Sequence, residues 1–206
     1  MKSYQSSNLM VVTKNQSLDD VLELLSKGFK LFGENKVQEA KSKYLALDTS
    51  KEHYKLHLIG PLQRNKVKLA LKVFDAIQTV DRFSLVDEIS KYLTKLPEIK
   101  TKEFYIQVNI GGEDQKFGVS KENLKDLYDY SIEKKIFVRG LMCIPPNITD
   151  PSDFFKQMVD IRDNIDSNLN LSMGMSNDYK IALNFQANII RIGSLIFQWN
   201  ISMYLS

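Results

Sequence analysis

The residues of this chain best suited to chemistry are a lysine near its start and a set of small polar residues near its end. Lys14 directly follows the apolar segment 9–13. A lysine amine that is partly desolvated at the end of a buried strand can react with an aldehyde to form an imine. The alternative for Lys14 is a solvated surface lysine with no reaction to perform.

Two short segments rich in Gly and Ser could bind a phosphate group. The first contains Gly174 and Ser176, and the second contains Gly193 and Ser194. Small residues let backbone N–H groups approach phosphate oxygens, and the hydroxyls add further donors. Ser176 also stands where a helix is expected to begin, so the helix dipole favours an anion there. The alternative is that Ser176 is only the N-cap of that helix.

Two polar residues fall within apolar segments. Arg191 is flanked by isoleucines, so its guanidinium has to find an acceptor, and a structural ion pair with Glu34 or Asp81 is one expectation. His57 alternates with leucines, and by itself it is interpreted as a hydrogen-bonded histidine of the core.

Composition excludes several classes of protein. With two histidines and one cysteine, Cys143, we expect no metal site and no disulfide framework. The net charge of +3 and the lack of a run of five basic residues argue against nucleic acid. No apolar run exceeds four residues and residues 1–8 are polar, so we expect a cytoplasmic protein without a membrane segment. The motifs GxSxG, GxGxxG and GxxxxGK[ST] are absent.

Apolar segments of strand length alternate with helical patterns along the chain. The segments lie near 9–13, 29–32, 56–59, 76–80, 103–110, 136–142, 170–173 and 188–192. The first seven are followed by helical patterns, which begin at Ser17, near 35–47, 62–73 and 82–95, at Ser120, at Asp150-Pro151 and near 176–186. No helix is predicted after the eighth segment.

This alternation predicts parallel strands joined by right-handed crossovers. Eight strands favour a (β/α)8 TIM-type barrel, and a doubly wound open sheet is the alternative. We expect one domain over residues 1–206 with its core at about 9–197. In such barrels the chemistry lies where strands run into helices, which places Lys14, Ser176 and Ser194 at the same end.

Nine short stretches along the chain match one known family. They are VVTK (11–14), FGENKVQE (32–39), HLIGPLQRNK (57–66), QVNI (107–110), KFG (116–118), RGLM (139–142), IPP (144–146), LSMGMSND (171–178) and RIGS (191–194). In their number, order and spacing, from Leu9 to Phe197, the sequence resembles the pyridoxal phosphate homeostasis protein family. These are single-domain relatives of the N-terminal barrel of bacterial alanine racemase.

The resemblance implies a site for pyridoxal 5'-phosphate (PLP). It implies that Lys14 forms an aldimine with the cofactor, that Ser176, Gly193 and Ser194 hold the phosphate, and that Arg191 faces the pyridine nitrogen. Asn35, His57 and Met142 lie in matching stretches and are included among the cofactor-binding residues.

The chain also departs from the family pattern. The helix that precedes the first strand in the family and the final helix are expected to be reduced or absent. Pro61 stands where the family more often has His or Gly. Cys143 and Ser194 each stand where it more often has Thr. These changes bear on stability and on the closing seam of the barrel more than on the cofactor contacts.

Four functions remain open at this point. The resemblance implies a monomeric protein that buffers or delivers PLP, with enzymes that need this cofactor as candidate recipients and with no turnover of its own. The first alternative is a PLP-dependent amino-acid racemase, which needs a second acid or base opposite Lys14. A phosphosugar enzyme or Schiff-base aldolase on the same barrel is a third reading. The fourth is a folded homologue that no longer carries the cofactor.

Overall fold

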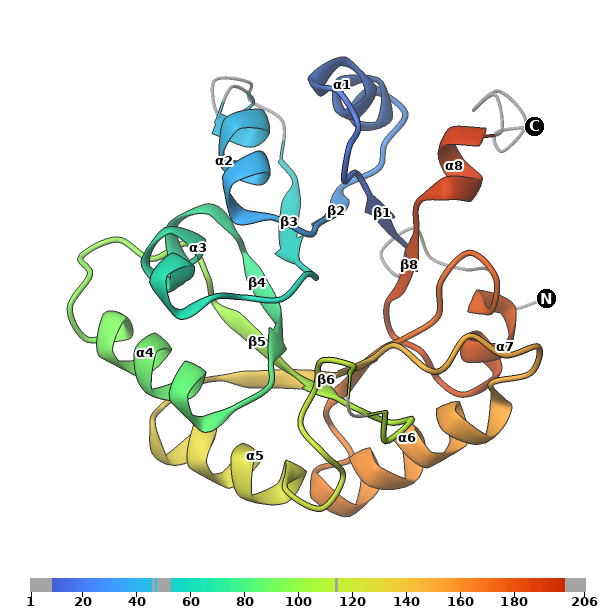
Figure 1. Ribbon diagram of the computed structural model, residues 1–206. Coiled ribbons are helices and arrows are strands. Elements are labelled where there is room, and N and C mark those ends of the chain that lie inside the picture. The colour runs from blue at the N-terminus through green and yellow to red at the C-terminus, as the bar shows by residue number, and fades with distance from the viewer. Residues whose placement is uncertain (1–8, 46, 48–52, 114, 199–206) are drawn as a thin grey trace.

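In the computed structural model, which describes residues 9–45, 47, 53–113 and 115–198, eight strands surround a central axis and helices cover the outside (Figure 1). The strands are β1 (Leu9–Val12), β2 (Leu31–Glu34), β3 (Lys55–Leu58), β4 (Ala76–Val80), β5 (Glu103–Val108), β6 (Val138–Cys143), β7 (Asn170–Ser172) and β8 (Ile190–Ile192). The helices are α1 (Leu18–Ser26), α2 (Val37–Leu45), η3 (Arg64–Lys66), α3 (Val67–Val73), α4 (Phe83–Leu93), α5 (Leu124–Glu133), α6 (Ser152–Ile165), α7 (Tyr179–Asn184) and α8 (Ser194–Gln198).

The strands form a closed parallel barrel. Their order is β7-β6-β5-β4-β3-β2-β1-β8, and each named pair is parallel. The seam between β7 and β8 is closed by a parallel bridge between Ser172 and Ile189 and by a 2.8 Å bond from the Arg191 N–H to the Gly174 carbonyl. The predicted (β/α)8 barrel is therefore confirmed, and the open doubly wound sheet is wrong.

Local signals explain why the helices begin where they do. Ser17 accepts a hydrogen bond from the Asp20 N–H at 3.1 Å and Asp20 returns one to the Ser17 N–H at 2.8 Å, which makes a capping box for α1. Asp150 accepts from the Ser152 N–H at 3.0 Å at the start of α6. The start of α1 agrees with the predicted cap, whereas α6 begins one residue later than predicted, at Ser152, with Pro151 as its N-cap.

Several elements differ from the prediction in their bounds. The helix expected to follow Ser120, for example, begins at Leu124. The second strand begins at Leu31 rather than 29, because Gly28 has a positive φ of 89° and the Phe29 N–H still bonds to the Leu24 carbonyl at the end of α1. The helix predicted from 176 begins at Tyr179, after a turn over 176–178. A short helix, α8, does follow the eighth strand, whereas none was predicted. The expected loss of an N-terminal helix concerns residues 1–8, which lie outside the described part of the chain.

The core has two parts, because successive strand residues point to opposite faces. A large apolar layer lies between the strands and the helices and includes Val11, Phe32 and Leu56. A smaller cluster of Met10, Tyr105, Met142 and Ile189 fills the barrel interior. Polar residues share that interior, among them His57, Gln78, Ser172 and Arg191, all of them buried. In the described residues no helix has the length and apolar character to cross a bilayer.

Candidate functional site

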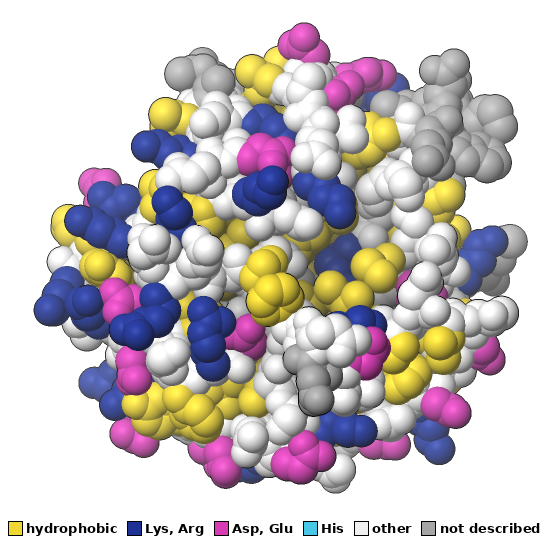
Figure 2. All heavy atoms as spheres, in the orientation of Figure 1, with side chains coloured by type: hydrophobic (Ala, Val, Ile, Leu, Met, Phe, Trp, Pro, Cys, Tyr) yellow, Lys and Arg dark blue, Asp and Glu magenta, His cyan; other side chains and the backbone are white. Residues whose placement is uncertain are grey.

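A cavity of about 920 Å³ opens at the carboxyl ends of the strands. It is lined by Val12, Lys14, Asn35, Ile59, Lys116, residues 144–149, residues 175–178, Arg191, Gly193 and Ser194. Figure 2 shows this face of the molecule, with a hollow near its middle where Lys and Arg side chains lie between hydrophobic ones. The loops after β1, β2, β3, β5, β6, β7 and β8 thus contribute to one space.

Six of the eight residues singled out from the sequence line this cavity: Lys14, Asn35, Ser176, Arg191, Gly193 and Ser194. The structure does not bring the other two to it. His57 lines a second cavity, of about 780 Å³, whose lining comes largely from the opposite ends of the strands. Met142 is fully buried against Met10 and Tyr105 within the barrel.

Ser176 and Ser194, which we call the hydroxyl pair, follow the ends of β7 and β8. Ser194 Oγ donates to Ser176 Oγ at 3.1 Å, although the two residues are 18 positions apart in the chain. Gly193 stands between β8 and α8, where an added Cβ would meet Val12 at 3.3 Å. The small residue therefore lets β8 approach β1 closely and leaves the two hydroxyls at one end of the cavity.

Arg191 is held by neutral acceptors. Its Nη1 donates to Ser172 Oγ at 2.9 Å and its Nη2 donates to the Cys143 carbonyl at 2.8 Å. The expected ion pair with Glu34 or Asp81 is wrong, because those carboxylates pair with Lys43 and Arg82. Burial lowers the pKa of the Arg191 guanidinium, but this pKa is so high that the group stays charged at ordinary pH.

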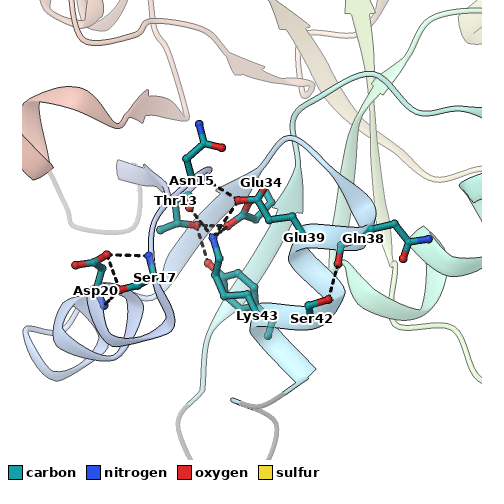
Figure 3. A network of polar contacts seen from close by, with 10 residues as sticks. Thr13, Asn15, Ser17, Asp20, Glu34, Gln38, Glu39, Ser42 and Lys43 are labelled. Atoms are coloured by element: carbon teal, nitrogen blue, oxygen red, sulfur yellow. Dashed lines mark hydrogen bonds and ion pairs between the residues drawn. The ribbon is translucent and has the colours of Figure 1, made fainter.

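The backbone on the N-terminal side of Lys14 is fixed by buried polar contacts behind the barrel wall (Figure 3). Thr13 Oγ1 donates to Glu34 Oε1 at 2.7 Å, and Lys43 Nζ donates both to Glu34 Oε1 at 2.8 Å and to the Thr13 carbonyl at 2.7 Å. Since the Thr13 hydroxyl proton is used on Glu34, the Tyr44 hydroxyl, 2.8 Å away, is the donor to Thr13.

The C-terminal side of Lys14 is fixed by the same cluster. The Asn15 N–H donates to Glu39 Oε1 at 2.7 Å, and Glu39 lies 3.5 Å from Lys43 Nζ. Asn15 has a positive φ of 60°, which turns the chain sharply after Lys14. We call Thr13, Glu34, Glu39, Lys43 and Tyr44 the anchor network, since it holds both neighbours of the lysine.

Lys14 itself is exposed in the cavity wall. Its side chain stands where the cavity meets solvent, so the structure gives no support for the partial desolvation considered from the sequence. Desolvation is concentrated on Glu34 behind it: burial raises the pKa of this carboxyl, while hydrogen bonds from Lys43 and Thr13 lower it. Glu34 Oε2 is buried and has no hydrogen-bond partner in the described structure.

Sequence reasoning assigned no role to two charged residues of the cavity, Lys116 and Asp178. Lys116 comes from the loop after β5 and lies 2.6 Å from Glu113, and Asp178 Oδ1 accepts from the Met175 N–H at 2.6 Å. Both positions fall within stretches that match the family. With Lys14 and Arg191, three cations and one carboxylate line the cavity, which favours an anionic ligand.

No protein-family model matches the chain, but curated proteins do. The pyridoxal phosphate homeostasis protein of Aquifex aeolicus is 38% identical over 200 residues, which cover 93% of this chain and 86% of the relative. That of Helicobacter pylori (strain 26695) is 33% identical over 198 residues, which cover 92% and 86%. The chain belongs to the pyridoxal phosphate homeostasis protein family. The resemblance stated from the nine stretches is thereby confirmed.

Solved structures agree with this membership. PipY of Synechococcus elongatus PCC7942 is 29% identical without PLP and 28% identical with PLP bound, with TM-scores of 0.83 and 0.82 and coverage of at least 93% of each chain. Alanine racemase from Acinetobacter baumannii shares the barrel fold at 14% identity, with a TM-score of 0.73 over 93% of this chain and 56% of the racemase. In the described residues no group of three His, Cys, Asp or Glu side chains could hold a metal ion.

Proposed function

We propose that this protein binds PLP in the cavity at the carboxyl ends of the strands and serves PLP homeostasis by holding and releasing the cofactor. The observation that carries the proposal is the presence of an amine, Lys14, and a hydroxyl pair, Ser176 and Ser194, on one cavity of about 920 Å³. The curated relatives carry the name of this role, and one PipY structure contains PLP.

The donors of the cavity fit the parts of this cofactor. PLP supplies an aldehyde, and condensation of the Lys14 amine with it forms a C=N bond and releases one water. The Ser176 and Ser194 hydroxyls can rotate from their mutual contact to donate to a phosphate oxygen. Arg191 presents a charged guanidinium to the cavity, where it can face the pyridine nitrogen. Asn35 lines the same space.

Equilibrium dialysis of the purified protein against PLP tests the proposal. We expect saturable binding with a yellow chromophore, and a colourless protein that retains no PLP would favour a folded homologue that has lost the cofactor. Pyridoxal without phosphate is the control ligand. We expect it to bind much more weakly, because it leaves the hydroxyl pair without an anion.

Removal of either hydroxyl should weaken retention of PLP. Ser176→Ala and Ser194→Ala each delete one donor to a charged acceptor, which contributes about 1.5–3 kcal/mol. The dissociation constant from dialysis should therefore rise by roughly 10–150-fold for each variant. Ser42→Ala on α2 is the matched control, since its hydroxyl lies outside the cavity and donates to the Gln38 carbonyl. Unchanged affinity in both site variants would place the phosphate elsewhere.

We also propose that the bound cofactor does not turn over amino acids. Racemisation needs an acid or base on the face opposite Lys14. His57 cannot supply it, because it lies at the other cavity, and burial raises the pKa of the Cys143 thiol to about 12. Lys116 and Asp178 are the remaining titratable side chains of the cavity. Lys116 is paired with Glu113, and Asp178 accepts a hydrogen bond from the Met175 N–H.

Chiral chromatography of L-alanine incubated with loaded protein checks this prediction. We expect no D-alanine above the rate of free PLP. Turnover near the enzyme median of about 10 s⁻¹ would support the racemase alternative instead. In that event Lys116→Gln should abolish it if Lys116 is the second base.

Release of PLP from the cavity would supply it to other proteins. Because Lys14 is exposed at the cavity mouth, a released cofactor can leave towards solvent or towards an apoenzyme that requires PLP. We propose such apoenzymes as recipients, and a cytoplasmic monomer as the state that meets them. Size-exclusion chromatography with light scattering tests the monomer, and transfer to an apoenzyme is measured by the activity it recovers.

A further inference from the structure

Four buried polar side chains form a continuous hydrogen-bonded chain through the barrel interior. Arg191 Nη1 lies 2.9 Å from Ser172 Oγ, Ser172 Oγ lies 2.7 Å from Gln78 Oε1, and Gln78 Nε2 lies 2.9 Å from His57 Nδ1. All four side chains belong to residues that are at most 4% exposed. The chain connects the cavity lined by Arg191 to the second cavity, lined by His57.

The direction of this chain follows from the donors available. A guanidinium only donates, so Ser172 Oγ accepts from Arg191. The Gln78 side chain turns its Oε1 towards Ser172, so the Ser172 hydroxyl donates its proton to that oxygen. The amide group of Gln78 then faces His57 with its NH₂ group and donates to Nδ1. Burial lowers the pKa of His57 to about 3, so the ring is neutral at ordinary pH and its proton is on Nε2. With the Gln78 Oε1 towards Ser172 and its Nε2 towards His57, every link of these hydrogen bonds has one donor and one acceptor.

This series of hydrogen bonds orients the Arg191 side chain. No carboxylate in the described structure forms an ion pair with it, so Ser172 and the Cys143 carbonyl are the two groups that orient the guanidinium. A serine hydroxyl can rotate about its C–O bond. The hydrogen bond to the Gln78 side-chain Oε1 fixes the Ser172 hydroxyl, so that a lone pair of Ser172 Oγ points towards Arg191. Without that fixed acceptor, a buried Arg191 N–H would lose its partner.

We propose that Ser172 and Gln78 are positioning residues of the cofactor site: with His57 as the terminal acceptor, they hold the Arg191 guanidinium in the orientation that faces the ring nitrogen of PLP. This inference rests on the proposed binding of PLP in the cavity. It gives His57 a role in the site without contact to the cofactor.

The test compares PLP with its 1-deaza analogue, in which a carbon replaces the ring nitrogen and the aldehyde and phosphate are kept. If Arg191 faces the nitrogen, the wild-type protein should bind PLP roughly tenfold or more tightly than the analogue. Ser172→Ala and Gln78→Met should both reduce this preference at least about threefold, because the guanidinium loses its orientation. The ratio of two affinities is insensitive to a general loss of stability.

Two variants serve as controls. Thr101→Val removes a buried hydroxyl that bonds to the Phe74 carbonyl at 2.7 Å, outside the chain, and should keep the full preference. Ser172→Thr retains the hydroxyl and should restore the preference that Ser172→Ala loses. An equal preference in wild type, Ser172→Ala and Gln78→Met would overturn the proposal. Wild-type protein that binds PLP but does not discriminate would overturn it too, and protein that binds no PLP would instead refute the function on which it rests.

A second measurement leaves all four hydrogen-bonded residues unsubstituted. Long-range ¹H–¹⁵N spectra of ¹⁵N-histidine-labelled protein report the tautomer of each ring, and His53→Gln assigns the two signals. We expect His57 to be neutral with its proton on Nε2. A proton on Nδ1 would mean that Gln78 does not donate to it, which would contradict the chain even if Ser172→Ala and Gln78→Met failed to fold.

Discussion

Loaded Lys14→Ala protein should show no label on any lysine after borohydride reduction and peptide mapping, whereas the wild type should carry about one label per chain on Lys14. Lys14 is the residue that the anchor network holds on both sides, through the Thr13 carbonyl and the Asn15 N–H. It is also the lysine at the end of β1, on the cavity that contains the hydroxyl pair. PLP should still bind Lys14→Ala non-covalently, with a spectrum close to that of the free aldehyde.

Lys116→Ala is the matched control for this experiment, because Lys116 lines the same cavity and pairs with Glu113. We expect this variant to carry the label on Lys14 as the wild type does. Label on Lys116 in the wild type, with Lys14 unmodified, would refute the assignment of Lys14 while leaving the cavity as the binding site.

The sequence predicted the parts of this molecule that depend on pattern. Alternating strand and helix segments indicate a parallel barrel, and the carboxyl ends of its strands meet at one end. Ser176 and Ser194 were therefore expected near each other although they are 18 positions apart, and their oxygens lie 3.1 Å apart. Such predictions need only the order of the elements and not the position of each residue along its strand.

Position along the strand is what the sequence could not supply. His57 was placed among cofactor-binding residues, yet it lies at the opposite cavity, because depth within a barrel depends on register with neighbouring strands. The partner of Arg191 was missed for the same reason, since Ser172 and the Cys143 carbonyl reach it only across the closed interior. Lys43 gave no signal at all: its pairing with Glu34 depends on how α2 packs over β1 and β2.

The Lys43–Glu34 pair should contribute strongly to stability. The side chains are 8% and 0% exposed, and removal of one partner leaves a buried charge without compensation. Lys43→Met should lower the free energy of unfolding in urea by about 3–5 kcal/mol at neutral pH. Lys27→Met breaks the more exposed pair with Glu23 and should cost less than about 1 kcal/mol.

The pH dependence of this loss identifies its cause. Burial already raises the pKa of Glu34, and loss of Lys43 removes a hydrogen bond and a positive charge that lower it. A carboxyl whose pKa is higher in the folded state than in the unfolded state destabilises the fold above its folded pKa, and the penalty disappears as the pH falls towards the unfolded value. The deficit of Lys43→Met should therefore shrink as the pH is lowered from 7 towards the ordinary glutamate value of 4.5. Glu34→Gln combined with Lys43→Met should recover part of the loss at pH 7, and a deficit that is the same at every pH would contradict a buried charge as its origin.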